Sequence, residues 1–89
     1  MIEINLDEGF KRSFKKIIKN NPDIKDKFKE KLELLKDDPY TISLKTHILS
    51  GKLKDYYAFS VKYKTRVMFE FIDDNTILLI DIGSHDEIY

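Results

Sequence analysis

The sequence has no cysteine among its 89 residues. A chain without cysteine cannot form a disulfide, a zinc site with thiolate ligands or a cysteine nucleophile. Packing alone must therefore hold the fold together. A reducing cytoplasm is the compartment that we expect for such a protein.

Long hydrophobic segments are also absent. The longest aliphatic run, Ile77 to Ile80, is far shorter than the roughly 20 apolar residues that a membrane-spanning helix needs. The first residues, Met1-Ile2-Glu3, do not have the pattern of a secretory signal peptide. We therefore expect a protein that neither spans a membrane nor is exported.

The chain also lacks a net charge, because 16 Lys and Arg residues balance 16 Asp and Glu residues. Non-specific binding of nucleic acid usually needs an excess of basic residues, so any such role must depend on where the charges lie. Residues 9–31 have a net charge of +6 and residues 45–66 one of +5, whereas residues 70–87 have one of −6. The chain is therefore polarised.

Two basic regions result from this polarity. For the region over residues 9–31, an ordinary solvated helix surface is a sufficient explanation. For the second region, an ordinary charged surface and a binding surface both stay open. The basic side chains of this second region are Lys45, Lys52, Lys54, Lys62, Lys64 and Arg66.

The hydrophobic residues, 42% of the chain, first follow the period of a strand and then that of two helices. Apolar residues alternate with polar ones over residues 1–6, which predicts a strand with one buried face. Asp7 predicts the start of a helix, and Asn21 followed by proline predicts the start of a second one. Asp37-Asp38-Pro39 should end the second helix, so the two form a hairpin.

The second half of the chain has the period of strands. Residues 40–54 show no period, and we expect them to be irregular. Apolar and polar residues alternate over residues 57–63 and again over residues 67–71, which predicts two antiparallel strands. Residues 76–82 are apolar with little alternation, which predicts the central or best-protected strand. The order β-α-α-β-β-β predicts an α+β fold, with two helices on one face of a four-stranded antiparallel sheet, and a single domain over residues 1–89.

Two histidines are the candidate acid–base groups, because imidazole titrates close to neutral pH. His47 lies in the irregular segment, and His85 follows Gly83-Ser84 near the C-terminus. Either could also be an ordinary surface residue. Their spacing does not favour a metal site. Ser84 lies next to His85 but has neither an acidic partner nor a nucleophile elbow, so we assign it no hydrolase chemistry.

Arg66 is the candidate anion-binding residue. Arg66 and Met68 are two residues apart, so their side chains lie on the same face of the predicted strand. If the side chains on the opposite face of that strand pack on the helices, Arg66 lies on the open face of the sheet. A planar guanidinium there can hold a phosphate and stabilise charge that develops on it. A cross-strand ion pair with Glu70 or Asp81 is the alternative.

Tyr89 is the candidate for base stacking, because it lies four residues after His85 and an aromatic ring can stack on an RNA base. Packing of its ring against the sheet edge is the alternative.

Three stretches of the sequence resemble a known family. They are His47–Tyr57, Thr65–Phe71 and Asp81–Tyr89, which occur in the same order as the corresponding motifs of the RelE/ParE superfamily of bacterial toxins. The ending Gly-Ser-His closed by an aromatic residue is most similar to the YafQ-like and RelE/StbE branch. The resemblance covers essentially the whole chain and implies a RelE-like fold.

The resemblance implies a ribosome-dependent messenger-RNA endonuclease that cuts mRNA in the ribosomal A site. Such enzymes use no metal or other cofactor: the ribose 2′-OH attacks the adjacent phosphate, and side chains move the protons. Matched to the family, His85 is the catalytic general acid or base and Arg66 contacts the scissile phosphate. His47 corresponds to a loop histidine of the YafQ-like branch, and Tyr89 to the terminal aromatic that orients the base.

The resemblance further implies partners and additional site residues. The partners are the 70S ribosome, mRNA and a cognate antitoxin protein that forms a heteromeric complex with the toxin. Lys45, Lys52, Lys54, Lys62 and Lys64 are the expected RNA- and ribosome-binding residues. That branch has an acidic residue before the hydrophobic strand where this chain has Thr65 and Arg66, and Asp81 or Asp86 could take its place.

Two other functions remain open from the sequence. A ParE-like toxin has the same fold but inhibits DNA gyrase by binding, although His85 and Tyr89 argue against that function here. A degenerate member of the family would retain only antitoxin binding. The neutral charge of this chain is a departure from the basic character usual for family nucleases.

Overall fold

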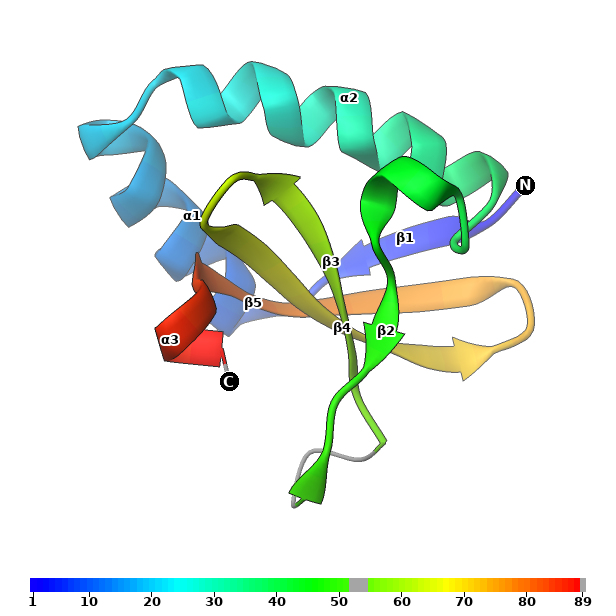
Figure 1. The fold of residues 1–89 in the computed structure, drawn as a ribbon. Helices are drawn as coiled ribbons and strands as arrows, with labels where there is room; N and C mark the ends of the chain where they lie inside the picture. Colours follow the sequence, from blue (N-terminus) through cyan, green and yellow to red (C-terminus); the bar gives the residue numbers. More distant parts are fainter. Residues whose placement is uncertain (52–54, 89) are drawn as a thin grey trace.

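The computed structural model describes residues 1–51 and 55–88. These residues form one five-stranded sheet with two long helices and a short C-terminal helix (Figure 1). The elements are β1 (Glu3–Leu6), α1 (Glu8–Asn20), α2 (Asp23–Asp37), a 3₁₀ helix η1 (Ile42–Leu44), β2 (His47–Ile48), β3 (Tyr57–Lys62), β4 (Thr65–Asp73), β5 (Thr76–Ser84) and α3 (His85–Ile88). The predicted α+β class and the order of the main elements are confirmed.

The sheet differs from the predicted one in two respects. Its order is β1-β5-β4-β3-β2, so a fifth strand, β2, lies within the segment that we expected to be irregular. This strand has only two residues, which is too short to produce a period in the sequence. In addition, β1 pairs with β5 in parallel, which makes the sheet mixed. Alternation predicts a strand but not its direction. Of the two alternatives predicted for residues 76–82, the best-protected strand is confirmed: β4 is the middle strand, but β5 pairs on both sides and has more buried residues than any other described strand.

The helix starts illustrate where capping signals succeed. Asp7 caps α1 as predicted, because its Oδ2 accepts a hydrogen bond of 2.9 Å from the Gly9 amide. For α2 the prediction was wrong by one position: Pro22 itself takes the cap position and has helical backbone angles. No side chain caps this helix, and Asp23 and Asp26 in its first turn interact favourably with the helix dipole.

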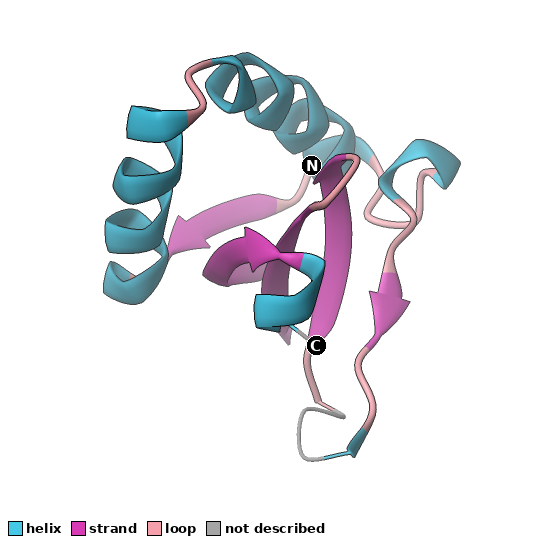
Figure 2. Cartoon of the chain, turned by 60° about the vertical axis from the view of Figure 1, so that its left-hand side comes forward, coloured by secondary structure: helices cyan, strands magenta, loops and turns pink. Residues whose placement is uncertain are grey.

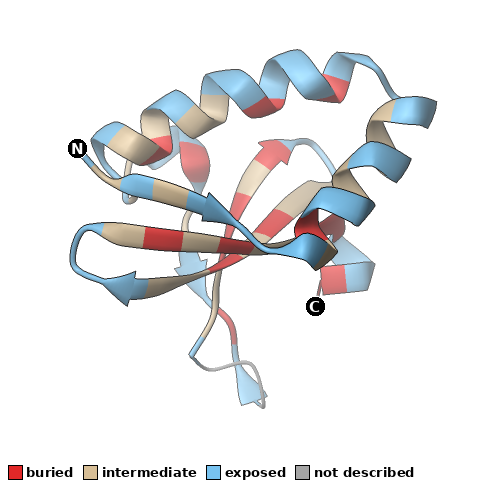
Figure 3. Cartoon of the chain, turned by 180° about the vertical axis from the view of Figure 1, so that it is seen from behind, coloured by how far each residue is buried: buried red, intermediate tan, exposed pale blue. Residues whose placement is uncertain are grey.

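The main core lies between the two long helices and one face of the sheet. Figure 3 shows buried positions on the sides of the helices and strands that face each other. Phe10 from α1 and Phe28 from α2 meet with ring centroids 5.6 Å apart, and they pack with Phe69 and Ile77 from the sheet. This packing fixes which face of each strand points away from the helices.

The substitution Ile77→Val tests this packing. Ile77 is fully buried, and loss of one methyl group from such a site lowers the free energy of unfolding by about 0.5–1.5 kcal/mol. Ile72→Val is the matched control, because Ile72 is 55% exposed and its truncation should change the free energy of unfolding by less than about 0.5 kcal/mol. Urea denaturation of both variants measures the difference. Equal losses would contradict the burial pattern.

A second, smaller core holds α3 against the other face of the sheet. Ile88 from α3 is buried there with Leu49 and Ala58, and Met68 packs against them. Figure 2 shows α3 lying against the strands, well separated from α2. Because α3 follows β5 directly, this small core places His85 beside the ends of β4 and β5.

Candidate functional site

The short helix α3 begins with a reciprocal pair of hydrogen bonds. The Ser84 amide donates to Glu87 Oε1 at 2.8 Å, and the Glu87 amide donates to Ser84 Oγ at 3.3 Å. This arrangement is a capping box, which satisfies two backbone donors that a helix start leaves unpaired. The His85 amide donates to the Lys64 carbonyl at 2.9 Å and ties α3 to the β3–β4 turn. The capping box and the hydrogen bond to Lys64 together fix the position of the His85 backbone.

Gly83 permits the close approach of Glu87. A Cβ atom on Gly83 would lie 3.1 Å from Glu87 Oε1 and 3.3 Å from Glu87 Cβ, which is tighter than ordinary van der Waals contact. The Gly-Ser pair before His85 thus has a structural reason: glycine leaves room for the carboxylate, and serine completes the capping box.

The capping box should respond to pH. The hydrogen bond from the Ser84 backbone amide, followed by that from the Ser84 side chain, lowers the pKa of Glu87 below its ordinary value of 4.5. Because the folded pKa is lower than the unfolded one, the box stabilises α3 fully above the unfolded pKa. It loses this contribution as the pH falls through the folded pKa. The NMR shift of the Ser84 amide should follow this titration and should not do so in Glu87→Gln; a titration retained in Glu87→Gln would contradict it.

Arg66 lies on the face of the sheet that carries α3, as the parity argument predicted. In the sheet register it is opposite Ser60 on β3 and Gly83 on β5. Its Nη1 donates to three carbonyl oxygens of the β3–β4 turn, those of Tyr63 at 3.1 Å and of Lys62 and Thr65 at 3.2 Å. These acceptors, rather than an ion pair with Glu70 or Asp81, hold the guanidinium in place.

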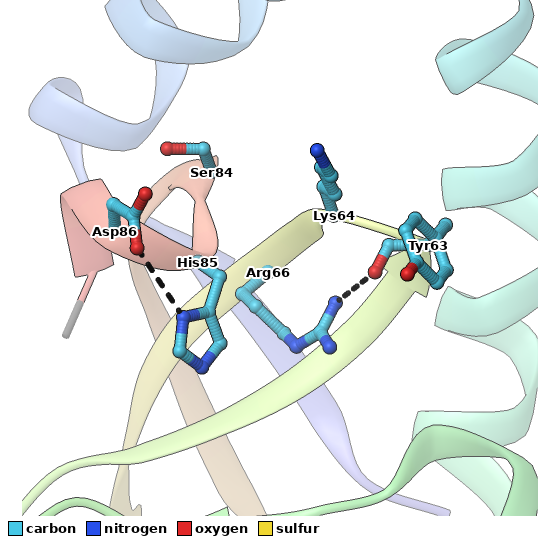
Figure 4. Close-up of a pocket in the computed structure, with 6 residues that line it drawn as sticks. All are labelled: Tyr63, Lys64, Arg66, Ser84, His85 and Asp86. Carbon is cyan, nitrogen blue, oxygen red and sulfur yellow. Dashed lines mark hydrogen bonds and ion pairs between the residues drawn. The ribbon is translucent and has the colours of Figure 1, made fainter.

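Arg66 and His85 share a surface cleft of about 350 Å³. The residues that line it are Tyr63, Lys64, Arg66, Ser84, His85 and Asp86. Figure 4 shows the guanidinium of Arg66 between the imidazole of His85 and the Tyr63 backbone. Asp86 Oδ1 lies 3.7 Å from His85 Nδ1, where it can pair with the imidazolium form. The cleft thus combines an acid–base group with an anion-binding group.

His47 joins the same site from β2. A cleft of about 270 Å³ is lined by Lys45, His47, Ser60, Arg66 and His85, so the fold brings both histidines and the arginine together. His47 Nδ1 lies 2.9 Å from the Lys45 carbonyl oxygen. Because a carbonyl only accepts, Nδ1 carries the proton, and in the neutral ring the lone pair is on Nε2.

The predicted lysines have different surroundings. Lys45 lines the cleft of the two histidines, and Lys64 lines the cleft of Arg66 and His85. The Nζ of Lys62 forms an ion pair with Asp23 at the start of α2, so part of its charge is neutralised. Lys52, Lys54 and Tyr89 lie outside the described residues.

The two predicted acidic residues are not equivalent. Asp86 lies beside His85, but Asp81 lines neither cleft of Arg66 and His85. Its Oδ1 accepts a hydrogen bond of 2.9 Å from the Ile82 amide, and its partner in the sheet register is Met68. Asp86 is therefore the acidic residue that the structure places at the site.

A larger cleft lies at the other end of the β4–β5 hairpin. Its volume is about 510 Å³, and it is lined by Ile2, Pro39, Tyr40, Phe71, Asp73 and Asp74. Among the residues that the structure describes, no histidine, lysine or arginine lines this cleft, and its two carboxylates would repel a phosphate. The chemistry therefore points to the smaller clefts around Arg66.

Sequence reasoning missed some of these residues. The Ser84-x-x-Glu87 spacing is the sequence signature of a capping box and could have predicted the C-terminal helix. Ser60 and Tyr63 had no signal, since a serine in a strand and a tyrosine in a turn are common on any surface. Only the sheet register shows that Ser60 faces Arg66.

A family model described as the bacterial toxin YafQ of type II toxin–antitoxin systems matches residues 2–89. The chain belongs to the YafQ toxin family. This membership confirms the resemblance to the RelE/ParE superfamily and to its YafQ-like branch. No curated protein matches the sequence significantly.

Solved structures agree with the YafQ family fold. A metal-bound toxin from Helicobacter pylori is 29% identical over 100% of both chains, with a TM-score of 0.76. A chain of the E. coli DinJ–YafQ complex is 20% identical, with a TM-score of 0.81 over 100% of this chain and 99% of that one. A YoeB/ParE toxin from Agrobacterium tumefaciens is 12% identical over 94% and 99%, with a TM-score of 0.78. The last two show likeness of fold alone.

Two further findings concern the described residues of this YafQ family member. None of their helices is long and apolar enough to cross a membrane. Within residues 1–51 and 55–88, no three His, Asp or Glu side chains lie close enough to hold a metal ion together.

Proposed function

We propose that this toxin is a ribosome-dependent mRNA endonuclease that cuts the message in the A site. The observation that carries the proposal is the meeting of His47, Arg66 and His85 around adjoining clefts on one face of the sheet. Cleavage of RNA by its own 2′-OH needs a base, an acid and a cation beside the phosphate, and these three side chains supply all of them.

The geometry suggests a role for each side chain. His47, with its proton held on Nδ1 by the Lys45 carbonyl, is suited to take the proton of the 2′-OH through Nε2. The 2′-oxygen then bonds to phosphorus while the bond from phosphorus to the 5′-oxygen breaks, which leaves a 2′,3′-cyclic phosphate. Arg66 stabilises the charge on the phosphate, and His85 gives a proton to the leaving 5′-oxygen.

We also propose that the protein acts in the cytoplasm and that a cognate antitoxin binds and inhibits it. The family consists of toxins of toxin–antitoxin systems, and a structurally similar E. coli chain is found in the DinJ–YafQ complex. A toxin that acts on translating ribosomes must work where they are, and an antitoxin must cover its active face or distort it to keep the cell growing.

The test uses purified protein and ribosomes programmed with a defined mRNA. We expect cleavage inside the A-site codon, and no cleavage at that bond when a single 2′-deoxynucleotide replaces the ribonucleotide 5′ to it. Cleavage that persists on the deoxy substrate would contradict the 2′-OH mechanism. Intact mRNA together with loss of DNA gyrase supercoiling activity would instead support a ParE-like inhibitor. If the protein neither cleaves mRNA nor inhibits gyrase, the result would support an antitoxin-binding module.

A further inference from the structure

A third cleft adjoins the candidate site on the side away from His85. It has a volume of about 410 Å³, and Lys31, Lys45, Ser60, Tyr63 and Arg66 line it. It shares Arg66 and Tyr63 with the cleft that contains His85, and it shares Lys45, Ser60 and Arg66 with the cleft that contains both histidines. The three clefts therefore adjoin one another around Arg66.

Tyr63 is an aromatic residue at the border of two of these clefts. It lies in the turn between β3 and β4, and it is 86% exposed, so it contributes little to the core. Its backbone carbonyl accepts a hydrogen bond from Arg66, which orders the turn. In Figure 4, Tyr63 lies on the opposite side of the Arg66 guanidinium from His85. An exposed ring in this position offers an open face to a planar ligand.

The charges in the third cleft favour an anion. Lys31 reaches from α2 toward η1, where its Nζ lies 3.4 Å from the Ser43 carbonyl oxygen. Lys45 directly follows η1 as its C-cap residue and has a left-handed backbone conformation with φ of 53°. Among the described residues no carboxylate lines this cleft. Lys62 also lines it, but its ion pair with Asp23 leaves Lys31, Lys45 and Arg66 as the main positive groups.

We propose that the third cleft binds the nucleotide next to the cleaved bond. The base of this nucleotide stacks on the Tyr63 ring, and the phosphate of the same nucleotide lies between the ammonium groups of Lys31 and Lys45. This inference rests on the proposed function for the position of the cleaved phosphate at Arg66 and His85. Because stacking accepts every base, the subsite holds single-stranded RNA in register without selecting a sequence.

The test measures binding of an RNA that the protein cannot cleave. The probe is a fluorescein-labelled 2′-O-methyl hexanucleotide, whose binding is followed by fluorescence anisotropy at several salt concentrations. Tyr63→Ser should weaken binding by about 5- to 100-fold, and Tyr63→Phe, which keeps the ring, should stay within about twofold of the wild type. Lys31→Ala should reduce the slope of log affinity against log salt by about 0.7. Lys29→Ala, on the same helix but outside the cleft, should leave both quantities unchanged.

Two results of the binding measurement would overturn the subsite. One is equal affinity of the wild type and Tyr63→Ser for the probe, and the other is failure of the wild type to bind the probe at all. The ribosome cleavage assay on the wild type is run in parallel. Binding that depends on Tyr63 without any cleavage would overturn the proposed function and leave the third cleft as an RNA-binding site with no cleaved bond beside it. Cleavage that is unaffected in both Tyr63→Ser and Lys31→Ala would overturn the subsite and leave the proposed function standing.

Discussion

His85→Ala should slow cleavage of ribosome-bound mRNA by roughly 100- to 10,000-fold, the range expected for loss of a general acid or base. The loss should be much smaller on a substrate in which sulfur replaces the bridging 5′-oxygen at the cleaved bond. A thiolate leaves without being protonated, so an acid is no longer needed. Single-turnover rates on the two substrates separate a lost proton donor from lost binding, since weaker binding would affect both substrates equally.

The stability of His85→Ala serves as its control. The side chain of His85 is 56% exposed, so the substitution should change the free energy of unfolding by less than about 0.5 kcal/mol. Asp86→Asn is the matched variant on the same short helix, with a side chain fully in solvent. We expect it to slow cleavage by less than about tenfold, because it removes only an ion pair with the imidazolium. Equal slowing of His85→Ala on both substrates would contradict the acid role.

Arg66→Lys should slow cleavage by roughly 100- to 1,000-fold, although the positive charge is retained. The guanidinium uses Nη1 to bind the carbonyls of the β3–β4 turn, and the rest of its planar fork can bind phosphate at the same time. An ammonium is a point donor and cannot serve both geometries. We therefore expect Arg66→Lys to be closer to Arg66→Ala than to the wild type.

A change in the turn must be separated from a change in chemistry for Arg66. Thermal unfolding and the NMR shift of the His85 amide, which donates to the Lys64 carbonyl, report on the turn. Lys29→Ala is the control, because it removes a positive charge from α2 at a residue that lines none of the three clefts around Arg66. A rate for Arg66→Lys within a few-fold of the wild type would show that charge alone suffices at this position.

The sequence predicted those parts of the fold that depend on local periodicity. The helical period of the apolar residues predicted the helices that contain Phe10 and Phe28, and the alternation after Tyr57 predicted the meander. Both patterns depend on which side of an element is buried. The parallel pairing of β1 with β5 could not be predicted, since it depends on where the chain returns after two helices. The two-residue strand β2 was also missed, because it has no period of its own.

For the site, the sequence supplied the residues and the structure supplied their arrangement. Parity placed Arg66 on the open face of the sheet, and the register confirms this. No sequence pattern could bring His47 to His85, because the strands β3, β4 and β5 lie between them in the chain and the approach of the two histidines depends on β2 pairing with β3. The contribution of Glu87 was overlooked, although its spacing from Ser84 is a known helix-start signal. The exposure of Tyr63 is a tertiary property that no local pattern contains.

The most direct test of the central claim is made in cells. Wild-type protein and His85→Ala are expressed under an inducible promoter, and the 5′ ends of cellular mRNA are mapped by primer extension. The proposed function predicts growth arrest with new 5′ ends inside translated codons for the wild type, and neither effect for His85→Ala. Arrest without new ends, unchanged by the substitution, would contradict it and indicate a toxin that acts by binding another target.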